Sequence, residues 1–94
     1  MDDNRRTSLR RGLKRMHRQV TTLVNNYYRI NSKLPDFADL DDMWIAVSDK
    51  INDPQVRGRL RQVKCQGYMR QPDSSIYVLL GIPDHVRTSM GDDD

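Results

Sequence analysis

Apolar side chains recur through the first third of the chain at alternating steps of four and three residues. They stand at Leu9, Leu13, Met16, Val20, Leu23, Tyr27, Ile30 and Leu34. This spacing lies on one face of a helix and also matches the heptad of a coiled coil. It predicts a long helix that begins near Ser8, a suitable N-cap residue, and ends before Pro35. The apolar seam of this helix either faces the core of its own domain or pairs, up to about Val20, with a second copy in a homodimer.

A second apolar pattern, in which Leu40 and Trp44 share one face, predicts a helix over residues 40–51. The connection over residues 33–37 is expected to be extended, because Pro35 disfavours helical angles in the residue before it. Four aspartates surround the start of this second helix. They are Asp36, Asp39, Asp41 and Asp42. Clustered carboxylates could hold a hard cation, but the segment lacks the glycine turn of a calcium site, so helix capping is favoured and no metal site is predicted.

The stretch over residues 54–80 predicts a helix that runs directly into a two-stranded hairpin. Asp53 is a suitable N-cap, and the proline after it suits the first helical turn. The helix is expected over residues 54–69, with an apolar stripe at steps of four, three and four residues. This stripe consists of Val56, Leu60, Val63 and Gly67. A polar turn over residues 71–75 and a β-branched, apolar strand over residues 76–80 complete the hairpin.

With 94 residues, of which 36% are hydrophobic, the chain is long enough for one domain with a modest core. The expected organisation is a flexible basic arm over residues 1–7, a mainly helical α+β domain over residues 8–82 and a disordered acidic tail over residues 83–94. The chain contains no run of about 18 apolar residues and does not open like a secretory leader, so we expect a cytoplasmic protein without membrane contact. The single cysteine, Cys65, cannot form an internal disulfide and suits a reducing compartment.

The net charge of +3 conceals a strong segregation along the chain. Residues 1–35 contain nine Lys or Arg and two Asp, whereas residues 36–53 contain one Lys and six Asp. Residues 54–72 contain five Lys or Arg and no acid, and the remainder contains one Arg and five Asp. Two basic blocks separated by an acidic one favour a polyanionic partner over mutual neutralisation within the fold. The excess of Arg, twelve against four Lys, suits phosphates and base edges.

Seven basic side chains fall within the first helix and the arm before it. They are Arg5, Arg6, Arg10, Arg11, Lys14, Arg15 and Arg18. This density exceeds what solubility needs and predicts contacts with phosphates. An anionic membrane surface is the weaker alternative, because the segment has no Trp or Phe to anchor it.

The sequence contains no catalytic constellation. His17 and His85 lie far apart, and neither has another His or Cys at the spacing of metal ligands. A phosphate-binding glycine loop and a nucleophile elbow are both absent from the sequence, and Cys65 has no adjacent His or second Cys to activate it. We therefore expect a protein that is not an enzyme, with no cofactor and no small-molecule substrate.

The predicted order is helix, extended piece, helix, tight turn, basic helix, polar turn and apolar strand. This order resembles that of winged helix-turn-helix domains over about residues 20–82, where the segment VRGRLRQVKCQGYM has the spacing of a recognition helix that leads into the wing. The resemblance implies a winged helix-turn-helix fold with a long basic N-terminal helix and a C-terminal two-stranded wing. A short strand commonly lies in such domains where residues 33–37 stand here.

By that resemblance the helix over residues 54–69 would enter the major groove of double-stranded DNA, while the wing and the N-terminal arm would contact the backbone. The recognition-helix candidates are Gln55, Arg57, Arg59, Arg61, Gln62 and Lys64. The wing candidates are Arg70, Gln71, Ser74 and Ser75, and the N-terminal candidates are Arg5, Arg6, Arg10, Arg11 and Lys14. The expected function is a small DNA-binding transcriptional regulator, associated with the nucleoid or, in a eukaryote, with the nucleus.

Two other functions fit the sequence less well. One is a protein-interaction module in a replication, transcription or viral assembly, with the apolar seam and the acidic block over residues 36–53 as its contacts. The other is RNA binding, which the lone Phe37 and the lack of an aromatic-rich strand disfavour.

Overall fold

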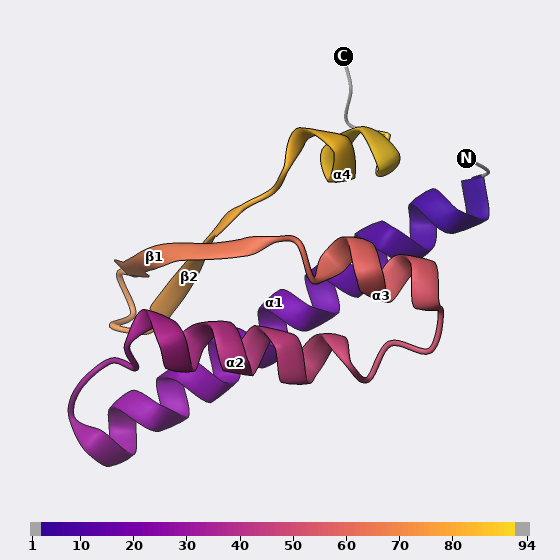
Figure 1. The fold of residues 1–94 in the computed structure, drawn as a ribbon. Coiled ribbons are helices and arrows are strands. Elements are labelled where there is room, and N and C mark those ends of the chain that lie inside the picture. The colour runs from indigo at the N-terminus through magenta and orange to yellow at the C-terminus, as the bar shows by residue number, and fades with distance from the viewer. Residues whose placement is uncertain (1–2, 92–94) are drawn as a thin grey trace.

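The computed structural model describes residues 3–91 and has the mainly helical α+β fold that the sequence predicts (Figure 1). The elements in chain order are α1 (Asp3–Asn31), α2 (Phe37–Ser48), α3 (Pro54–Leu60), β1 (Lys64–Arg70), β2 (Ile76–Gly81) and α4 (Asp84–Ser89). The two strands form an antiparallel sheet. Helices α2 and α3 and strand β2 all pack against α1, which runs through the length of the molecule. Within residues 3–91, no helix is both long and apolar enough to cross a bilayer.

Helix α1 buries one face in the core of its own chain. That face consists of Leu9, Met16, Val20 and Val24, each at most 1% exposed. Beyond Val20 the predicted heptad seam is wrong, because an α-helix has 3.6 residues per turn and its core face passes to Val24 instead of Leu23. Leu23 is 43% exposed and Ile30 is 75% exposed. Of the two alternatives for the seam up to Val20, the core of its own domain is the one that the burial of Leu9, Met16 and Val20 supports, and a homodimer contact through these three side chains is not supported.

The predicted flexible arm over residues 1–7 is wrong for its described part, because α1 begins at Asp3 and not near Ser8. The first turns are held in place by contacts that span the whole chain. Leu9 is fully buried, and Arg10 Nε donates to the Met90 carbonyl oxygen at 2.7 Å. Residues 1–2 lie outside the described residues.

Helix α2 starts at Phe37, three residues before the predicted start, because Asp36 caps it. The Asp39 backbone N–H donates to Asp36 Oδ1 at 2.8 Å, which confirms the capping role predicted for this carboxylate. No strand forms over residues 33–37, and the sheet of the described chain contains only β1 and β2. Trp44 is 2% exposed, and its Nε1–H donates to the Leu60 carbonyl oxygen at 2.8 Å, which ties α2 to α3.

The predicted helix over residues 54–69 is wrong beyond Leu60. The N-cap is confirmed, since Asp53 Oδ1 accepts from the backbone N–H groups of the first turn. After Leu60 the buried positions are Val63 and Cys65, two residues apart, which is the period of a strand. From Lys64 onward the backbone pairs with β2, with one irregularity between Cys65 and Gly67. The helical spacing of Val56, Leu60 and Val63 therefore does not extend the helix, because the chain from Lys64 onward pairs with β2.

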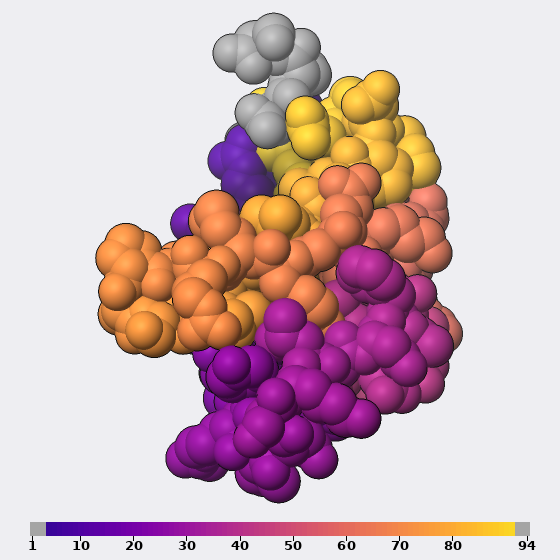
Figure 2. Space-filling model, turned by 90° about the vertical axis from the view of Figure 1, so that its left-hand side faces the viewer, coloured from indigo at the N-terminus to yellow at the C-terminus, as the bar shows by residue number. Residues whose placement is uncertain are grey.

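The hairpin is fastened to α1 along the free edge of β2. The Asn25 side chain donates to the Ile76 carbonyl oxygen and accepts from the Ile76 N–H, both at 2.9 Å. His17 Nε2 lies 2.7 Å from the Val78 carbonyl oxygen, an atom that can only accept. The turn itself requires Ser74 at a φ of 72°, and Figure 2 shows the hairpin, in orange, projecting to one side of the helical body.

The predicted disordered tail over residues 83–94 is wrong for residues 84–89, which form α4. Val86 is fully buried and Met90 is 5% exposed, so this helix adds to the core beside the start of α1. The described domain therefore continues past residue 82. Residues 92–94 lie outside the described residues.

Candidate nucleic-acid interface

The most strongly charged surface is the solvent side of the first half of α1. Five exposed cations follow one another there at alternating steps of one and three residues. They are Arg10, Arg11, Lys14, Arg15 and Arg18, and together they are called the α1 basic face. This face lies opposite the buried stripe of the same helix, since the two differ by roughly 180° at 100° per residue. The sequence contains no acid between Asp3 and Asp36, and none of the five makes an ion pair within residues 3–91.

The α1 basic face is bordered by a shallow hollow on each side. On the side of α2 and α3, a hollow of about 270 Å³ is lined by Arg11, Arg15 and Lys50, with Ile51 and Val56 among its apolar walls. Lys50 stands in the turn after α2 and brings a sixth cation to the face. The sequence analysis missed it, because Lys50 belongs to the acidic block and only the packing of α2 on α1 places it there.

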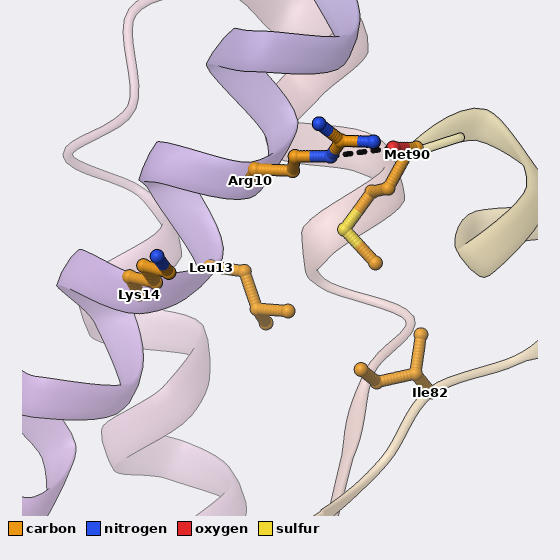
Figure 3. Close-up of a pocket in the computed structure, with 5 residues that line it drawn as sticks. All are labelled: Arg10, Leu13, Lys14, Ile82 and Met90. Atoms are coloured by element: carbon orange, nitrogen blue, oxygen red, sulfur yellow. Dashed lines mark hydrogen bonds between the residues drawn. The ribbon is translucent and has the colours of Figure 1, made fainter. Parts of the chain in front are cut away.

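On the side of β2 and α4, Arg10 and Lys14 border a hollow of about 310 Å³ (Figure 3). Leu13 of α1, Ile82 of the connection after β2 and Met90 just after α4 extend toward this hollow, and Arg10 lies along its edge. The floor of this hollow is apolar, and its two charged side chains, Arg10 and Lys14, both stand on α1.

The six recognition-helix candidates do not form one surface. Gln55, Arg61 and Gln62 are exposed, Arg57 and Arg59 are half-buried, and Lys64 stands in β1 instead of on the helix. Arg57 Nη1 donates to the Ile51 carbonyl oxygen at 2.8 Å, and Arg61 Nη1 lies 3.7 Å from Asp49 Oδ1. These two cations are partly engaged with their own chain.

The wing candidates are largely engaged in the hairpin turn. Arg70 Nη1 donates to the Ser74 carbonyl oxygen at 3.2 Å, and its guanidinium lies 5.4 Å from the centre of the Tyr28 ring. Ser75 Oγ donates to Gln71 Oε1 at 2.8 Å. The tip of the hairpin therefore rests on the second half of α1, and Arg70 and Ser74 are its exposed members.

The N-terminal candidates divide between two environments. Arg5 Nη2 lies 3.7 Å from Asp53 Oδ2, and the half-buried Arg6 has its Nε atom buried without a hydrogen-bond partner in the described chain. Arg11 and Lys14 are exposed and belong to the α1 basic face together with Arg10. The structure thus brings three of these five candidates together with Arg15 and Arg18 of the same predicted basic run, and adds Lys50.

The described chain offers little reactive chemistry. Burial raises the pKa of the Cys65 thiol to about 11, so the thiol stays protonated at neutral pH. Within residues 3–91, no group of three His, Cys or Asp side chains is placed to hold a metal ion. The Tyr68 hydroxyl, whose pKa is raised by burial, donates to the Pro35 carbonyl oxygen at 2.8 Å in a structural contact.

Comparison with known proteins gives no relative: no family model, no curated protein and no solved structure matches this chain. The function must therefore be argued from the surfaces of the molecule.

Proposed function

We propose that this chain is a non-enzymatic, double-stranded DNA-binding protein of the regulatory class, with the α1 basic face as its main contact. The observation that carries the proposal is the run of five exposed cations on one helix face with no acid among them. Duplex DNA presents a dense array of phosphates, and a protein that neutralises several of them gains affinity by releasing counterions. A straight, rigid helix holds its cations at fixed spacings, which lowers the entropy lost on binding.

Helix α3 supplies the second part of the proposed contact. Its exposed side carries Gln55, with the half-buried Arg59 beside it, and the exposed Gln62 stands in the turn after the helix. These side-chain types can hydrogen-bond to adenine and guanine edges. The order α1, α2, α3 and hairpin is the order of a winged helix-turn-helix domain, which supports the assignment. With seven residues, α3 reaches fewer bases than a long recognition helix, so we expect phosphate contacts to supply most of the affinity.

The test is fluorescence anisotropy of a labelled random duplex titrated with the protein over a range of salt concentrations. If the five cations of the α1 basic face each meet a phosphate, the logarithm of the association constant falls with the logarithm of salt with a slope of about −4 to −5. The double variant Arg11→Ala with Arg15→Ala should reduce the steepness of this slope by about 2.

The matched control is Arg61→Ala with Lys64→Ala, which removes the same charge from the α3 and β1 side of the molecule. Because Arg61 is already paired with Asp49, this control should change the slope much less. If the control variant lost DNA binding while the α1 variant kept it, recognition would belong to α3 instead. An absence of salt-dependent binding to any duplex would exclude the proposal.

A further inference from the structure

A second surface, distinct in chemistry from the α1 basic face, lies where β2 meets α1 and α4. Two neighbouring hollows, of about 310 and 540 Å³, share Leu13, Lys14 and Ile82 and so form one continuous groove. The apolar lining of this groove consists of Leu13, Tyr77, Leu79, Leu80, Ile82 and Met90. We call it the β2 groove.

The β2 groove is continuous with the outer side of the sheet, where large apolar side chains stay partly exposed among the described residues. Tyr77 is 37% exposed, Leu79 is 38% exposed and Met69, which pairs with Tyr77, is 49% exposed. The charge at the groove has one sign. Arg10 and Lys14 stand along its edge, His17 also lines it, and no acid among residues 3–91 does. An apolar floor beside cations suits an amphipathic segment that carries carboxylates.

The same chain displays a surface of the opposite kind on α2. Phe37, Asp41 and Ile45 follow one another at steps of four residues along the solvent side of this helix, with Asp42 beside them. Phe37 is 56% exposed and Ile45 is 38% exposed, so two apolar side chains flank the carboxylates. These four residues are called the α2 acidic face.

We propose that the β2 groove of one molecule receives the α2 acidic face of a second copy of this chain. Apolar contact would bury Phe37 and Ile45 against Leu79 and its neighbours, while Asp41 and Asp42 would meet the cations at the groove edge. The two surfaces cannot meet within one molecule, because α2 packs on α1 and β1 while the groove opens between α1, β2 and α4. The inference does not depend on DNA binding.

Contact between two different surfaces is heterologous, so each added molecule leaves one groove and one α2 acidic face unoccupied at the ends. Assembly therefore continues with concentration instead of closing at a two-fold dimer, unless a ring forms. Because exposed charges contribute, the assembly should weaken as salt screens them.

The experiment is sedimentation velocity at low salt on the full chain and on two variants that each block one surface. The first variant, Lys14→Asp with Leu79→Ser, alters the groove and leaves Arg10, which holds Met90, in place. The second, Asp41→Lys with Asp42→Lys, alters the α2 acidic face. We expect the unaltered chain to grow in mass with concentration, each variant alone to remain a monomer, and their equimolar mixture to reach twice the monomer mass and no more.

A matched control, Lys33→Asp, makes the same change of charge as Lys14→Asp just after the end of α1 and should assemble like the unaltered chain. Circular dichroism of each variant checks that it is folded. Monomeric behaviour of the unaltered chain at all concentrations would overturn the proposal. So would variants that assemble as well as the unaltered chain, or a mixture that stays monomeric.

Discussion

At the free edge of β2, the Asn25 side chain makes hydrogen bonds of the kind that a neighbouring strand would make. This side chain satisfies both the N–H and the carbonyl oxygen of Ile76, a residue that is 3% exposed. The Asn25→Ala variant leaves two backbone groups without partners, so we expect the free energy of unfolding to fall by about 1–3 kcal/mol. Urea denaturation measures the loss, and hydrogen exchange should be faster at the Ile76 amide. The control Asn26→Ala removes an exposed amide and should lower the free energy of unfolding far less. Equal losses in the two variants would contradict the role of Asn25 at the edge of β2.

Asp53 links the stability of α3 to pH. The backbone N–H groups of Val56 and Gln55 donate to its carboxylate, and these bonds lower its pKa below the usual 3.8. Because the folded-state pKa is the lower one, the ionised group stabilises the fold above pH 3.8, and this stabilisation is lost as the pH falls through the folded-state value.

The Asp53→Asn variant keeps a capping oxygen but does not titrate. Chemical denaturation at a series of pH values should therefore show a stability difference from the unaltered chain at neutral pH that disappears on acidification. Asp42→Asn, at an exposed position inside α2, is the matched control. A difference that persists unchanged in acid would contradict the assignment.

At the scale of elements, two helical glycines have opposite surroundings. A Cβ at Gly12 of α1 would lie 2.8 Å from Leu60 Cδ1, a fully buried side chain, whereas a Cβ at Gly58 of α3 meets nothing within 4 Å. Alanine in a helix interior gains about 0.5–1 kcal/mol over glycine, while forcing a packed core apart costs about 1–3 kcal/mol. Thermal denaturation should show Gly58→Ala to be more stable than the unaltered chain and Gly12→Ala to be less stable. A stabilising Gly12→Ala would mean that α1 and α3 are less tightly packed.

The sequence predicts a helix well where its apolar spacing and the capping residue at its start agree. Helix α2 has both an apolar face and a capping Asp36, and the start of α3 has Asp53 followed by Pro54. The end of α3 is mispredicted, because Val56, Leu60 and Val63 fit a helix while Val63 and Cys65 fit a strand. Only pairing with β2, a long-range contact, decides between the two periods.

The candidate site shows the same limit. Arg10, Arg11 and Lys14 are predicted from local charge alone, because no acid stands near them in the sequence. The engagement of Arg61 with Asp49 and of Arg57 with the Ile51 carbonyl oxygen depends on how α2 packs against α3. Such contacts join helices and turns that are separate along the chain. The spacing of residues within one helix therefore cannot show which cations stay exposed to solvent.

At the scale of the whole molecule, positive and negative charge gather on different helices. The α1 basic face carries five cations, and the α2 acidic face carries carboxylates beside exposed Phe37 and Ile45. Arg10 and Lys14 belong both to the α1 basic face and to the edge of the β2 groove. The proposed binding of DNA and the proposed assembly of the chain therefore compete for these two side chains.

Three substitutions separate the two processes. Arg18 lies outside the β2 groove, in a hollow with Leu23 and Val47, so Arg18→Ala should weaken DNA binding and leave assembly intact. Asp42→Asn should weaken assembly and leave DNA affinity equal or slightly higher, because it removes a repelling charge. Lys14→Ala should weaken both. Anisotropy with a labelled duplex measures DNA binding, and sedimentation velocity on the same preparations measures assembly. A Lys14 side chain that contacts a phosphate cannot also meet a carboxylate, so excess duplex should dissociate the assemblies of the unaltered chain. Assemblies that persist in excess duplex would contradict the competition.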